Sequence, residues 1–204
     1  MKERRLTSTL EALKEEKIIV VIDETGDRKK GKKTDYVARQ YLGSVGKIDN
    51  GIVSVNAYGI YENLTFPLIF KIFKPKGRLK ENDTYKTKIE LASSIVTELI
   101  EFGFKFVMTN IQLSRSKMKR ILGNLYGLRT WVEYGFRQCK QELGWTDYRF
   151  TNFNEINKWW ELIFSAYWMI SSHSKVFDGL NQNRALSDSN ILSKGQKRDN
   201  NIKL

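Results

Sequence analysis

The feature that most constrains this chain is an unbroken run of β-branched apolar residues near its beginning. Residues 17–23 read KIIVVID, and charged segments stand on both sides of the run. A strand with one solvated face would alternate apolar and polar side chains, whereas a continuous apolar run is typical of a strand that is covered on both faces. The run therefore predicts a central strand of a sheet inside a layered domain.

The segments around this strand supply the other elements of such a domain. Residues 1–16 predict a short helix, because three leucines recur at helical spacing. A polar loop over 24–36 and a turn signal at 49–51 precede two apolar runs that we interpret as an antiparallel pair. The strands and helices expected after the first strand cover residues 52–61, 66–73, 86–102, 104–110, 124–145 and 155–171.

The order of these elements is strand, strand, strand, helix, strand, helix, helix. It is the order of a ribonuclease-H-like fold, an α/β class with a mixed sheet flanked by helices, although other α/β folds share it. The length of 204 residues suits one domain, which we assign to residues 17–173. Residues 174–204 are polar and predict a disordered tail. The buried side expected for the helix over 86–102 consists of Ile89, Ala92, Ile95, Val96, Leu99 and Ile100.

Charge and composition narrow the function classes. The net charge of +12 favours a polyanionic partner, with nucleic acid ahead of an anionic membrane; the alternative is a basic protein without such a partner. One cysteine excludes an internal disulfide framework, and one histidine excludes a His-rich metal site. Without a signal peptide or an apolar stretch long enough to span a bilayer, we expect a soluble cytoplasmic protein that is not membrane-bound.

The segment over 124–145 carries two stripes of side chains at helical spacing. The apolar stripe predicts an amphipathic helix that faces a core. The polar stripe lies about 100° around the same helix, so that it borders the buried face and can line a cleft. An ordinary i,i+4 ion pair between Arg129 and Glu133 on an exposed helix is the alternative explanation. The apolar stripe is Leu125, Leu128, Val132, Phe136, Cys139 and Leu143, and the polar stripe is Tyr126, Arg129, Glu133, Arg137 and Lys140.

Four residues of the polar stripe form the pattern Y-x2-R-x3-E-x6-K, as Tyr126, Arg129, Glu133 and Lys140. With IDETGDRKKG upstream and ELGWTDYRF downstream, this pattern resembles the signature of DDE-type insertion-sequence transposases, which are DDE superfamily endonucleases. The resemblance extends over residues 5–171. It implies a ribonuclease-H-like core that acts on DNA.

The resemblance also implies roles for individual residues. In that family three carboxylates hold two Mg²⁺ (or Mn²⁺) ions; Asp23 matches the first carboxylate and Glu133 the last. Tyr126, Arg129 and Lys140 then flank the site and contact the transposon end. DNA is the implied partner, at the nucleoid of a prokaryotic cell, and a homo-oligomer is compatible with the family. The basic residues Arg28, Lys29, Lys30, Lys32 and Lys33 would grip the phosphate backbone; the alternative is an exposed basic loop without that role.

The second carboxylate of the family pattern is missing. It should follow the fourth strand in a segment that reads like LADS, whereas this chain reads FGFKFVMTNIQLS. Either Thr109 or Asn110 replaces the aspartate, or an internal excision removed it together with the usual insertion before the glutamate helix. We favour the excision. Because the ends also differ from the family pattern, we interpret the chain as a truncated and internally deleted copy.

Two other carboxylates near Asp23 could in principle substitute. Alternation along the strand points Glu24 away from Asp23, and we interpret Asp27 as a loop residue that offsets the lysines. Trp159 and Trp160 are assigned to core packing rather than to base stacking. Three functions stay open: a metal-dependent transposase, a non-catalytic DNA-binding remnant that competes with the full-length enzyme, and an inactive fragment. We expect a DNA-binding core with impaired catalysis.

Overall fold

The computed structural model describes residues 1–14, 16–61, 64–105 and 129–173. The chain divides into two compact units, Met1–Trp168 and Met169–Leu204. In the second unit the described residues form the end of a helix, where Nδ1 of His173 lies 2.8 Å from the carbonyl oxygen of Met169. The predicted tail over 174–204 lies outside the described residues.

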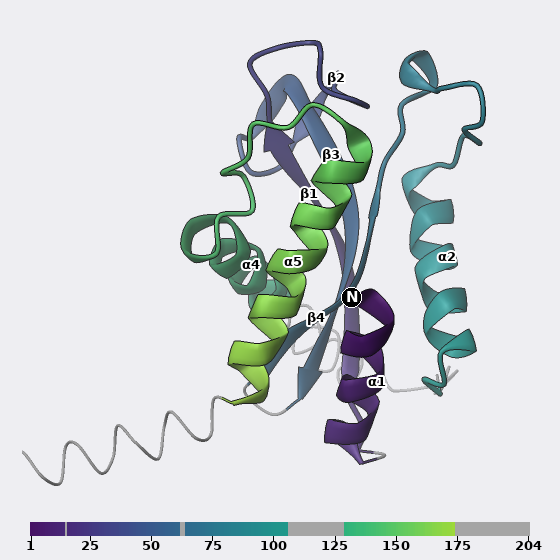
Figure 1. The fold of residues 1–204 in the computed structure, drawn as a ribbon, viewed down its shortest axis with the longest axis vertical. Helices are drawn as coiled ribbons and strands as arrows, with labels where there is room; N and C mark the ends of the chain where they lie inside the picture. The colour runs from purple at the N-terminus through teal and green to yellow at the C-terminus, as the bar shows by residue number, and fades with distance from the viewer. Residues whose placement is uncertain (15, 62–63, 106–128, 174–204) are drawn as a thin grey trace, which may run out of the picture. The chain divides into compact units, whose positions relative to one another are not determined.

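A four-stranded sheet forms the middle layer of the first unit (Figure 1). Its strands are β1 (Ile19–Arg28), β2 (Ala38–Leu42), β3 (Lys47–Tyr61) and β4 (Leu64–Ile72). The long strand β3 pairs antiparallel with β1 along one edge and with β2 and then β4 along the other. The predicted antiparallel pair is thus confirmed as β3 and β4. Most of the strand predicted over 104–110, which would have made the sheet mixed, lies outside the described residues.

Helices cover both faces of this sheet (Figure 1). One face carries α1 (Lys2–Leu13) and α2 (Lys88–Glu101), and the other carries α4 (Arg129–Arg137) and α5 (Phe153–Ser172). Each face has its own apolar core, one centred on Leu6, Leu68 and Ile95 and the other on Tyr58 and Trp160. The α/β class and the helix-flanked sheet are confirmed, and they are consistent with a ribonuclease-H-like fold. A 3₁₀ turn, η1 (Lys76–Arg78), and a π-helical turn, η2 (Gln138–Glu142), complete the described elements.

Two local predictions about the sheet are wrong. Residues 24–28, predicted as part of a loop, continue strand β1, and residues 49–51, predicted as a turn, lie inside β3. The hairpin turn is instead at residues 43–46, where Gly46 has a φ of 68°. Gly51 serves close packing, because a Cβ there would lie 2.6 Å from the carbonyl oxygen of Asp27. Pairing on both sides of β3 outweighs the local turn preference of these residues.

The predicted helix over 86–102 is confirmed as α2, but its buried face is partly wrong. Thr87 and Glu90 form a capping box that fixes where the helix starts. The buried residues are Leu91, Ile95 and Leu99, whereas Ile89 is 82% exposed and Ile100 is 53% exposed. A strict four-residue spacing aims one narrow stripe at the sheet, and Ile89 and Ile100 fall outside that stripe.

Among the described residues, none of the helices combines the length and the apolar character that a membrane crossing requires.

Candidate functional site

Asp23 lies on the face of the sheet that α4 and α5 cover. It stands opposite Asn56 of β3, and its Oδ1 accepts a hydrogen bond of 2.9 Å from the backbone N–H of Glu24. Side chains alternate along a strand, so Glu24 points to the other face. There its carboxylate pairs with Lys88 of α2 at 2.7 Å. The prediction that Glu24 points away from Asp23 is therefore confirmed.

Helix α4 carries Glu133 and packs closely on the same face. Val132 is buried, and Gly135 lies against the ring of Tyr58, to which a Cβ at that position would approach within 2.9 Å. Glu133 itself is exposed. Arg129 is the first residue of α4, and Tyr126 lies outside the described residues. The close approach of the Tyr58 ring explains why the helix has a glycine at position 135, where a larger residue would collide with that ring.

Lys140 joins the end of this helical stretch to strand β1. Its ammonium donates hydrogen bonds of 2.7 Å to Oγ1 of Thr25 and of 2.7 Å to the carbonyl oxygen of Gly26. Thr25 is two residues beyond Asp23 on the same face of the strand. Lys140 belongs to the π-helical turn η2, a feature that is frequent at functional sites. Lys140 thus connects η2, which follows α4, to strand β1. Asp23 lies two residues before Thr25 on that strand.

Asp27 belongs to the same face of β1, and its interpretation as a loop residue is wrong. Its side chain is buried, accepts a hydrogen bond of 2.9 Å from the hydroxyl of Tyr148 and pairs with Lys29 at 2.8 Å. Burial raises the pKa of Asp27, and the ammonium of Lys29 opposes that shift. Burial also lowers the pKa of Lys140. Residues 23–28 read DETGDR, without the apolar–polar alternation that could have shown the longer strand.

The predicted basic residues after β1 divide into two groups. Arg28 pairs with Asp49 at 2.8 Å, and the ammonium of Lys29 lies 3.6 Å from the ring centroid of Tyr148. Lys30, Lys32 and Lys33 are exposed. The first group is engaged in contacts within the sheet and with the segment before α5. The second group is available to an external partner.

The carboxylates that the structure describes do not fit a site for two divalent ions. Within the described ranges, no group of three His, Cys, Asp or Glu side chains is arranged to hold a metal. Residues 106–128, where the family pattern places the second aspartate, contain no Asp, Glu, His or Cys at all. Asp27 is already engaged by Lys29 and Tyr148.

Replacing Lys140 by methionine is expected to lower the free energy of unfolding by about 1–3 kcal/mol, because it leaves the buried oxygens of Thr25 and Gly26 without this donor. Arg137→Met on the same helix is the control, since Arg137 is exposed and bonds to Gln141. Its effect should stay within about 0.5 kcal/mol. Urea unfolding followed by circular dichroism measures both, and equal losses would contradict the role of Lys140.

Comparison with known proteins identifies the family of this chain. The family model described as DDE superfamily endonuclease matches residues 2–108. A probable transposase for insertion sequence element IS701 from Microchaete diplosiphon is 34% identical to this chain over an alignment of 246 residues. The alignment includes 74% of this chain and 65% of the relative. This chain thus spans less than two thirds of the length of that relative. No solved structure matches the chain. The chain belongs to the DDE superfamily endonucleases.

Proposed function

We propose that this chain is a DNA-binding transposase core whose own cleavage chemistry is severely impaired. The family reaction is divalent-metal-dependent cleavage and strand transfer of DNA. The observation that supports the proposal is that, within the described residues, no group of three His, Cys, Asp or Glu side chains could hold a metal ion. In addition, the segment over 106–128 contains no Asp or Glu.

The physical reason is the charge that such a site has to balance. In a site of this kind carboxylates such as Asp23 and Glu133 would hold the divalent ions, whose positive charge would stabilise the oxygens of the reacting phosphate. Asn110 or Thr109 at the place of the aspartate would supply a neutral oxygen, which cannot offset the charge as a carboxylate does. Catalytic groups that act as a unit lose about 10⁴–10⁶ in rate when one is removed.

The comparison with the transposase relative supports excision over point replacement. The alignment runs over 246 residues, whereas 74% of the 204 residues of this chain is about 151 residues. Roughly 95 aligned positions, the difference between 246 and 151, therefore have no residue of this chain opposite them. We infer that the missing positions include the second aspartate and the insertion before α4. A remnant of this kind would occupy transposon ends and compete with a full-length transposase at the nucleoid.

The test is a supercoiled-plasmid nicking assay with Mg²⁺ or Mn²⁺, paired with calorimetric metal titration and duplex binding. We expect the wild-type chain to bind duplex DNA and to give no nicking above background. Its nicking and its metal binding in calorimetry should equal those of the Glu133→Gln variant. Glu142→Gln is the control, because Glu142 is an exposed carboxylate of η2. Metal-dependent nicking that disappears in Glu133→Gln and persists in Glu142→Gln would show that the enzyme is still active.

A further inference from the structure

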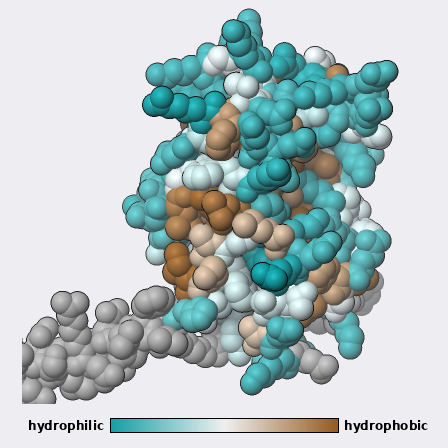
Figure 2. Space-filling view, viewed as in Figure 1, coloured by the Kyte–Doolittle hydropathy of each residue, from teal (hydrophilic) through white to brown (hydrophobic). Residues whose placement is uncertain are grey.

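Two basic loops that are distant in sequence lie at one end of the first unit. The first loop, residues 29–37, follows β1, and the second loop, residues 73–87, connects β4 to α2 (Figure 1). Figure 2 shows hydrophilic side chains gathered over this end of the molecule. We call the exposed basic side chains of both loops the two-loop surface. Its members are Lys30, Lys32, Lys33, Lys76, Arg78, Lys80 and Lys86.

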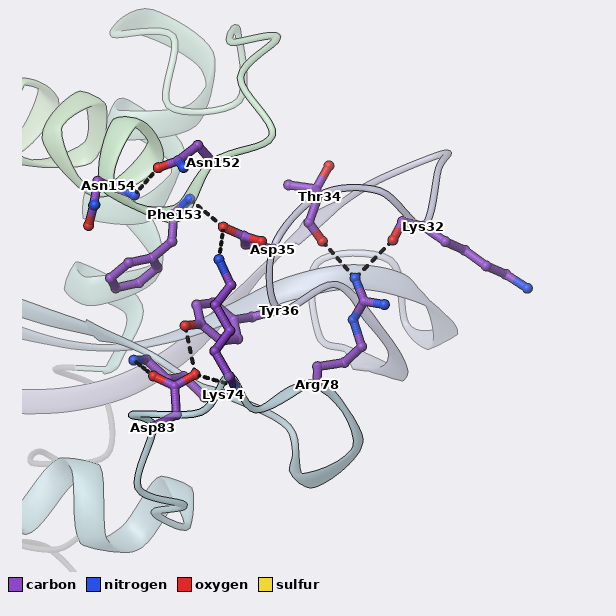
Figure 3. Close-up of polar contacts among 11 residues, drawn as sticks. Lys32, Thr34, Asp35, Tyr36, Lys74, Arg78, Asp83, Asn152, Phe153 and Asn154 are labelled. Atoms are coloured by element: carbon purple, nitrogen blue, oxygen red, sulfur yellow. Dashed lines mark hydrogen bonds and ion pairs between the residues drawn. The ribbon is translucent and has the colours of Figure 1, made fainter.

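Arg78 fastens the second loop to the first. Its Nη2 donates hydrogen bonds of 2.9 Å to the carbonyl oxygen of Lys32 and of 3.2 Å to that of Thr34 (Figure 3). The side chain of Lys32 extends away from this contact (Figure 3). Lys80 adds an ion pair of 2.7 Å with Asp35 of the first loop. These contacts hold the two loops together.

Two acidic side chains of this region, Asp35 and Asp83, make contacts within the loop junction. Asp83 pairs with Lys74 and accepts a hydrogen bond of 2.8 Å from the hydroxyl of Tyr36. The bond from Lys74 lowers the pKa of Asp83 to about 2. Asp35 also accepts a bond of 2.8 Å from the backbone N–H of Phe153, at the start of α5. With these carboxylates engaged, the charge that reaches the surface of the junction is mainly positive.

The exposed lysines carry charge that the rest of the described chain does not neutralise. In the parts of the chain that the structure describes, Lys30, Lys32 and Lys33 take part in no ion pair. Glu81 of the second loop is an exposed carboxylate that lowers the local charge in part. The large exposed apolar side chains of the described residues all lie outside both loops. A surface that binds anionic membranes would normally add apolar side chains for insertion.

We propose that the two-loop surface binds the phosphate backbone of duplex DNA, with both loops contributing and Arg78 holding the first loop in position. The inference rests on the proposed function and extends it to the second loop. Phosphate contacts from lysines position a protein on a duplex without reading its sequence. Each neutralised phosphate releases counterions, so the slope of log K against log[salt] reports how many contacts form.

The experiment measures fluorescence anisotropy of a labelled duplex over a salt series. The variants are Lys32→Gln with Lys33→Gln for the first loop, and Lys76→Gln with Lys86→Gln for the second loop. Each should reduce the magnitude of the salt slope by about 2, because about 0.9 is lost for each phosphate contact, and should weaken binding at least about 10-fold at low salt. Lys17→Gln with Lys105→Gln is the matched control, since both lysines are exposed and lie outside the loops.

Arg78→Gln tests whether the loops act together. We expect it to weaken duplex binding about as much as the first-loop variant does. When both changes are combined, the loss of binding free energy should be smaller than the sum of the two separate losses. Circular dichroism of every variant verifies that the fold is retained. Additive losses would contradict the positioning role of Arg78.

The outcomes separate this inference from the proposed function. Duplex binding that depends on the first loop alone would overturn the two-loop surface and leave the proposed function intact. No duplex binding by the wild-type chain would overturn both. Salt-sensitive binding to phosphatidylserine vesicles that exceeds duplex binding would assign the surface to a membrane instead.

Discussion

Replacing Trp160 by alanine is expected to lower the free energy of unfolding by about 3–5 kcal/mol. The side chain has an exposed fraction of 0%. Its ring stacks on Trp145 with centroids 4.4 Å apart and meets Phe70 of β4 edge-on at 5.7 Å. Removing it would leave a cavity between α5 and the sheet, which the surrounding rings cannot fill by small shifts. Urea unfolding followed by circular dichroism measures the loss.

The neighbouring tryptophan provides the control for this prediction. Trp159 is partly buried, and its Nε1 donates a hydrogen bond of 3.0 Å to the carbonyl oxygen of Gly144. Trp159→Phe keeps most of the apolar surface and loses that bond, so we expect a loss of about 1 kcal/mol. If Trp160→Ala were no more destabilising than Trp159→Phe, the packing of Trp160 would not be central to this core.

Replacing Arg5 by methionine is the second change with a large expected effect, a loss of about 3 kcal/mol. The guanidinium is buried and pairs with Glu161 of α5 at 2.8 Å. It also donates to Oγ of Ser165 at 3.1 Å and to the carbonyl oxygen of Leu68 at 3.0 Å. Methionine would fill part of the space but leave Glu161 without its cation in a shielded position.

A double variant separates the lost ion pair from the lost packing. Arg5→Met combined with Glu161→Gln removes the orphaned carboxylate charge, so the double variant should be more stable than the sum of the two single losses predicts. The variants are compared by their midpoints of urea unfolding, provided that the dependence of the free energy of unfolding on urea concentration is the same for all of them. Strictly additive losses would mean that the pair contributes no coupling between α1 and α5.

Local sequence patterns were enough to predict most of the elements. The apolar run over 17–23 and the apolar stripe of α4 each depend on residues within a few turns or a single strand. Cys139 was expected on the core side of its helix, and it is buried against the hydroxyl of Tyr58 at 3.5 Å. Asp23 and Glu133 came from the family pattern, not from geometry.

Tertiary contacts decided what local patterns misjudged. Strand β1 continues through Asp27 because β3 pairs with it residue by residue, and Tyr148, distant in the sequence, satisfies the buried carboxylate. Residues 49–51 stay extended because they pair with strand β2.

The candidate site and the two-loop surface depend on partners of this long-range kind. Lys140 finds its acceptors on β1, and Arg78 finds its acceptors in the first loop. Spacing along the chain determined which residue types face the same side of an element, because helical and strand periods are local properties of the backbone. Which elements meet, and hence which charges are buried together, was decided by packing between distant segments, whose register no local pattern encodes.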